Sequence, residues 1–208
     1  MTVQWSRQLL ERHVAPGICD FNRAEIPELN PSLVESGSWM FDHFLNSVFR
    51  AQYKDPVREQ AINCVYRVQT AIRIYQEAKS LTFSYLSKSK PGSPAISLYF
   101  ETLSTWEMCI LNWQILVLVY NRLTLSKAFT NLDGSIDQRA YEIANSIKHS
   151  GGAEVGTVIP TVPMWLTNDG FQTCNYSMTY DEFAQLLTQA GEFVQQIIDP
   201  KSAASSNA

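Results

Sequence analysis

The sequence predicts an all-α protein, an antiparallel helical bundle around a central apolar helix, with a small β-hairpin near the C-terminus. The central stretch, residues 108–120, reads MCILNWQILVLVY, and only Asn112 and Gln114 in it are plainly polar. A helix that is apolar on nearly every side belongs at the centre of a bundle, with other helices around it. By contrast, residues 162–178 alternate apolar and polar side chains around an Asn-Asp-Gly turn, which is typical of two short strands.

The composition narrows the class of protein. The chain has 208 residues, 45% hydrophobic and 17% charged, as expected for one globular domain with a substantial core. A formal net charge of -4 argues against a broad nucleic-acid-binding surface, and we expect no DNA partner. The four cysteines show no paired short spacing, so we expect reduced thiols, no metal site and no cofactor.

The chain shows no targeting or membrane signal. Its N-terminus lacks the basic and apolar segments of a signal peptide. The apolar run at residues 108–120 is shorter than the roughly 20 residues that span a bilayer. We therefore expect a cytoplasmic protein without membrane contact.

The first part of the chain is expected to be an N-terminal arm, residues 1–36. Residues 2–13 predict a short amphipathic helix, and a stretch rich in proline and asparagine follows it. Residues 37–200 are expected to form the helical bundle, and residues 201–208 a disordered tail because they are small and polar.

Two helices should precede the central one. Residues 39–53 carry apolar side chains at three- and four-residue spacing, including Phe41, Phe44 and Leu45. Asp55 and Pro56 then open a helix with an apolar face about eight turns long, up to Tyr85. The Pro- and Gly-containing run at residues 88–94 breaks it, so the central helix returns antiparallel and the two form a hairpin.

Three elements should follow the central helix. A helix over residues 136–149 is expected to end at Gly151 and Gly152. The hairpin at residues 162–178 should turn with positive φ at its Asn-Asp-Gly sequence and attach to the bundle through Trp165 and Phe171. Thr179 and Glu182 have the spacing of a capping box and should open the final helix.

One polar cluster is a candidate site. The apolar residues of helix 136–149 share one side, and Tyr141, Asn145, Lys148 and His149 lie on roughly the opposite side. Asn145 and His149 are four residues apart, so their side chains can meet, and Lys148 places a positive charge beside them. Such a set can hold a phosphate or a ribose hydroxyl, with His149 as the catalytic candidate. The alternative is an ordinary polar surface with a histidine near a helix C-terminus. His43 is expected to be a half-exposed structural histidine.

Three segments carry a resemblance to a known family. They are RAYEIANSIKHSGG (residues 139–152), PMWLTNDGFQ and TYDEFAQLL. In layout, residues 39–198 resemble the HEPN-like helical-bundle superfamily. Its ribonuclease members pair an arginine and a histidine on one helix, meet as dimers and cleave RNA without metal. His149 matches the histidine, but Ala144, Ile143 and Glu142 stand in the places of the arginine. This variant is similar to members without established nuclease activity.

Three functional hypotheses follow. The first is a HEPN-like protein, homodimeric, with a non-catalytic binding or regulatory role, whose Asn145, Lys148 and His149 recognise a nucleotide, RNA or a protein partner. The second is a metal-independent endoribonuclease of a toxin or anti-phage defence system, with His149 catalytic in a dimer. The third is a structural subunit of a larger complex. The missing arginine and the acidic charge favour the first and third over the second, and whether the protein is an enzyme stays open.

Overall fold

The protein is mainly helical, as the sequence predicts. The computed structural model describes residues 5–34, 36–45, 57–149 and 161–198. The helices in this part are α1 (Arg7–His13), α2 (Pro31–Val34), α3 (Trp39–Phe44), α4 (Val57–Lys88), α5 (Ile96–Thr124), α6 (Ile136–Lys148) and α7 (Tyr180–Ile198). The strands are β1 (Trp165–Leu166), β2 (Gly170–Gln172) and β3 (Ser177–Thr179), and a single 3-10 turn, η1 (Ser36–Ser38), precedes α3.

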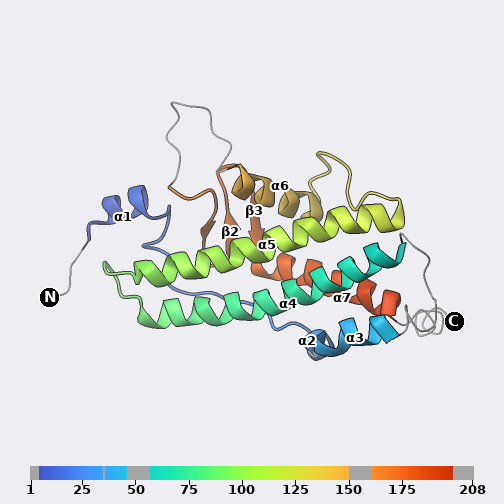
Figure 1. The fold of residues 1–208 in the computed structure, drawn as a ribbon. Coiled ribbons are helices and arrows are strands. Elements are labelled where there is room, and N and C mark those ends of the chain that lie inside the picture. The colour runs from blue at the N-terminus through green and yellow to red at the C-terminus, as the bar shows by residue number, and fades with distance from the viewer. Residues whose placement is uncertain (1–4, 35, 46–56, 150–160, 199–208) are drawn as a thin grey trace.

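The hairpin of α4 and α5 organises the fold. The two helices run antiparallel side by side, with α7 and the small sheet behind them and α6 alongside α5 (Figure 1). The apolar face predicted for α4 is buried almost throughout. Its predicted cap, Asp55 and Pro56, lies outside the described residues. A tight turn joins the hairpin, in which Lys90 and Ser93 pair and Gly92 has a φ of 72°.

Trp106 of α5 lies at the centre of the core. Its ring is 5.4 Å from that of Tyr75 on α4, 4.9 Å from Phe171 on β2 and 5.5 Å from Tyr180 on α7. Its indole nitrogen donates a hydrogen bond to Thr82 Oγ1 at 2.9 Å, so the one polar atom of this buried ring is satisfied. One side chain thus joins the central hairpin, the sheet and the last helix.

The length of α5 changes the argument about membranes. At 29 residues the helix is long and apolar enough to cross a bilayer by length and composition alone, although its most apolar run is shorter. However, 56% of its most apolar window is buried against the rest of the protein. The core helix of a soluble bundle has the same length and composition. The burial of α5, rather than the length of its apolar run, therefore favours a core helix over a membrane-spanning one.

Helix α3, within the helix predicted at residues 39–53, buries only some of its apolar residues. Trp39 and His43 face the core, whereas Phe41 and Phe44 are 64% and 50% exposed. The apolar spacing of this segment therefore does not mark the side that is buried, because α3 packs at the edge of the bundle through one short stripe. His43 is fully buried rather than half exposed, and burial lowers its pKa. Residues 46–56 lie outside the described part.

The N-terminal arm packs on the bundle. Helix α1 begins later than predicted, and Ser6 caps it by accepting a hydrogen bond from the Leu9 amide. Further on, Tyr75 of α4 donates a hydrogen bond to the carbonyl of Pro27 at 2.8 Å, and Phe21 stacks on Tyr85 at 5.4 Å. The arm therefore shares the core of the bundle. The predicted tail, residues 201–208, lies outside the described residues.

The predicted hairpin is part of a three-stranded antiparallel sheet, in which β2 pairs with both β1 and β3. Trp165 and Phe171 are buried as predicted. The expectation of positive φ at the turn is wrong, because Gly170 is not among the residues with positive φ. A Cβ at Gly170 would lie 2.0 Å from the carbonyl oxygen of Met178. The glycine is thus required for the close approach of β3, not for the turn conformation.

Candidate functional site

Helix α6 holds three of the four predicted site residues, and the fourth, His149, is its C-cap. Ser135 caps it by accepting a hydrogen bond from the Gln138 amide at 3.2 Å, and the apolar side with Ala140, Ile143 and Ala144 is buried. The helix ends at Lys148, with His149 as its C-cap. The predicted stop at Gly151 and Gly152 lies outside the described residues.

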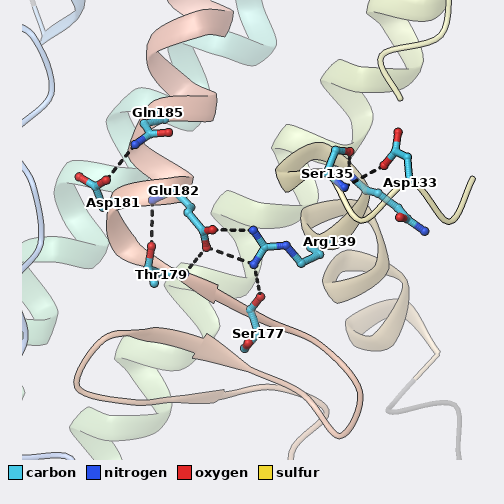
Figure 2. Close-up of polar contacts among 9 residues, drawn as sticks. Asp133, Ser135, Arg139, Ser177, Thr179, Asp181, Glu182 and Gln185 are labelled. Carbon is cyan, nitrogen blue, oxygen red and sulfur yellow. Dashed lines mark hydrogen bonds and ion pairs between the residues drawn. The ribbon is translucent and has the colours of Figure 1, made fainter. Parts of the chain in front are cut away.

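An ion pair fixes α6 against the last helix. Figure 2 shows Arg139 of α6 reaching Glu182 on α7, with its Nη2 2.5 Å from Glu182 Oε1, while Nη1 donates to the carbonyl of Ser177 on β3. Glu182 also completes the predicted capping box: its amide donates to Thr179 Oγ1, and its carboxylate accepts from the Thr179 amide. Hydrogen bonds from Arg139 lower the pKa of Glu182. Arg139 is therefore engaged in structure, away from His149.

Asn145 lies in the interface between α5 and α6. Its Oδ1 accepts a hydrogen bond from Gln114 Nε2 at 2.7 Å, and its Nδ2 donates to Glu142 Oε2 at 3.3 Å. Gln114, 2% exposed, also donates to the carbonyl of Tyr141 at 3.3 Å. These hydrogen bonds satisfy the side-chain amides of Gln114 and Asn145, which lie in the contact between α5 and α6. The Asn145 amide is thus already engaged by other side chains.

The other predicted site residues do not gather around Asn145. Tyr141 is half buried, with its ring 5.3 Å from that of Phe129. Lys148 and His149 are exposed at the C-terminal end of α6. The structure therefore brings Tyr141 and Asn145 to the side that packs on neighbouring segments and leaves two solvated groups at the helix end.

Glu107 is a titratable group that the sequence reasoning missed. Burial raises its pKa to about 7, and its carboxylate has no hydrogen-bond or ion-pair partner among the described residues. It lies two turns before Gln114 on the same side of α5. In the sequence, Glu107 is visible only as an acidic residue at the start of the apolar run 108–120, and this position by itself does not indicate a raised pKa.

A cleft opens at the other end of α6, where α5, α6 and α7 meet. Its volume is about 280 Å³, and its walls include Trp113 and Tyr120 of α5 and Phe193 of α7. Asp137, in the first turn of α6, is the acidic group at this cleft, and burial raises its pKa. Its side chain has no ion-pair partner in the described parts of the chain. Small molecules in proteins bind most often in clefts of this kind, which are mostly apolar and hold a few polar groups.

Comparison of the chain with family models, with curated proteins and with solved structures gives no match. The resemblance to the HEPN-like superfamily stays a prediction. Over the ranges that the structure covers, no three histidine, cysteine or acidic side chains gather in a way that would hold a metal ion.

Proposed function

We propose that the protein is a non-catalytic binding protein of HEPN-like type, and that its ligand is a planar, N–H-bearing molecule such as the base of a nucleotide. The observation that carries this proposal is the half-buried carboxylate of Asp137 at the aromatic cleft, which has no ion-pair partner among the described residues. The ligand thus belongs at the N-terminal end of α6, not at the end where the sequence predicted it.

The chemistry of the cleft favours a nucleobase. Aromatic side chains stack on planar rings, and a carboxylate accepts hydrogen bonds from the amino groups of cytosine and guanine. Guanine offers Asp137 two adjacent donors, N1–H and the 2-amino group, and cytosine offers one amino group; these hydrogen bonds offset the cost of burying the carboxylate. A phosphate has less support at the C-terminal end of α6, because the helix dipole there opposes an anion.

The proposal is tested by calorimetric titration with guanosine, cytidine, adenosine and uridine. Wild type should bind the nucleosides with amino groups more tightly than uridine, and Asp137→Asn should weaken the preferred one at least tenfold, roughly 1.4 kcal/mol. Asp181→Asn, at an exposed acidic residue in the first turn of α7, is the matched control and should bind like wild type. Absence of binding to wild type, or equal binding by Asp137→Asn, contradicts the proposal.

A second candidate function is the metal-independent endoribonuclease, and the exposed position of His149 beside Lys148 at the end of α6 favours it. A carboxyl group that titrates near 7, such as that of Glu107, suits general acid–base catalysis, and the exposed His149 is open to a substrate. Cleavage of labelled RNA in EDTA, lost in both Glu107→Gln and His149→Ala, would establish it. If wild type does not cleave the RNA, the endoribonuclease candidate is excluded and the binding function remains.

A further inference from the structure

The outer side of α5 carries an exposed apolar stripe. Met108 is 55% exposed, Ile115 37% and Leu118 40%, and Leu111 between them is half buried. These four residues, here called the α5 stripe, are spaced three, four and three apart and so share one side of the helix. The stripe is notable because it lies on the most apolar helix of the chain, whose opposite side forms the core.

The α5 stripe is symmetric along the helix. Met108 and Leu118 are equally far from position 113, and so are Leu111 and Ile115. A stripe with this property is complementary to itself when two copies run antiparallel across a twofold axis. Met108 would then face Leu118 of the other copy, and Leu111 would face Ile115. The seven-residue repeat from 108 to 115 and from 111 to 118 is the spacing at which paired helices stay in contact.

The charges beyond the stripe have the same symmetry. Glu101 lies near the N-terminal end and Arg122 near the C-terminal end, and both are exposed. Neither side chain has an ion-pair partner within the described ranges. In the antiparallel arrangement Arg122 faces Ser104, one turn from Glu101 on the same side. Each end of the pair would therefore join an acidic residue of one copy to a basic residue of the other.

We propose that the α5 stripe binds a second copy of this chain, antiparallel, with Glu101 and Arg122 pairing at both ends. This inference does not depend on the proposed nucleotide function. Gln114, which contacts α6, lies about a quarter of a turn from the stripe, so α6 leaves the stripe uncovered and the twofold axis repeats α6 on the same side of the pair.

The first test is the molar mass in solution. Light scattering and sedimentation from 1 to 100 μM should give a dimer for wild type and a monomer for Ile115→Glu. Phe83→Glu is the matched control. Phe83 is 42% exposed on α4, on the side opposite Arg67, whose guanidinium reaches Asn112 beside the stripe. This control should remain a dimer, and circular dichroism of each variant should show the helical content of wild type.

The second test exchanges the charges. Glu101→Arg and Arg122→Glu each place like charges at both ends of the pair and should raise the dissociation constant about tenfold. The double variant restores opposite charges, so its dissociation constant should return to the wild-type value. If either residue acted only by stabilising its own copy, the two substitutions would not compensate each other.

Three results would overturn the proposal. They are a monomeric wild type throughout this range, a dimer that Ile115→Glu leaves intact, and a double variant that dissociates as readily as the single ones. A wild-type monomer that sediments with phosphatidylcholine–phosphatidylserine vesicles would assign the stripe to a lipid surface instead.

Discussion

The two sides of α5 are built from the same kinds of residue but differ in what covers them. On the inner side, Trp106 is fully buried among aromatic rings from α4, β2 and α7. On the outer side, Ile115 and Leu118 face solvent. The inner side therefore determines stability and the outer side is available for assembly. The comparison teaches that an apolar run predicts a buried helix, but not which neighbour buries each side.

The largest effect should come from the inner side. Trp106→Ala removes the ring that joins three parts of the core and should lower the free energy of unfolding by about 3 to 5 kcal/mol. Phe100→Ala, on the exposed side of α5 and 38% exposed, is the control and should cost about 1 kcal/mol or less. Urea unfolding measures both, and similar losses for the two variants would contradict the difference between the sides.

The polar contact between α5 and α6 should give the next largest effect. Asn145→Ala leaves Gln114 buried without its side-chain partner and should cost about 1 to 3 kcal/mol. In the double variant with Gln114→Ala the losses should not add, with a coupling energy of about 0.5 kcal/mol or more. Additive losses would mean that the 2.7 Å contact contributes nothing specific.

The sequence predicts the fold class and most of the elements because their signals are local. The apolar face of α4 and the capping box at Thr179 and Glu182 both depend on residues a few positions apart. The orientation of α3 and the third strand were not predictable in this way. The orientation of α3 depends on its contacts with α4 and α7, and the third strand depends on the close approach of Met178 to Gly170 across the sheet.

The candidate site was harder to predict, for the same physical reason. A helical wheel places Tyr141 and Asn145 on the polar side of α6, but it does not show that α5 presents a buried glutamine, Gln114, to that side. Nor does it place Asp137 beside aromatic residues of two other helices. Residue spacing shows which residues share one side of α6, but not which neighbouring segments cover them.

Glu107 should give stability a dependence on pH. Burial raises its pKa from 4.5 to about 7, so the folded state binds an extra proton between these values. The stability it contributes is full below about pH 4.5 and is lost as the pH rises through about 7. Glu107→Gln should therefore gain about 1 to 2 kcal/mol relative to wild type between pH 4.5 and 8, after allowance for partial exposure.

The difference between the two unfolding curves isolates Glu107. His43 acts in the opposite direction, because burial lowers its pKa and protonation below about pH 6.5 disfavours the folded state. Its contribution is common to wild type and Glu107→Gln, so subtraction removes it. A difference curve that is flat from pH 4.5 to 8 would show that Glu107 is solvated.

The smallest effect should come from the α5 stripe, and two adjacent positions make the sharpest comparison. Leu116 is 5% exposed and Ile115 37% exposed. Leu116→Ala should cost about 2 to 5 kcal/mol because it opens a cavity. Ile115→Ala should cost about 1 kcal/mol or less in urea unfolding at the lowest usable protein concentration.

If the stripe pairs two copies, the cost of Ile115→Ala must grow as the protein concentration rises, because dimerisation adds stability only to the folded state. The cost of Leu116→Ala should not, because its contacts lie within one copy.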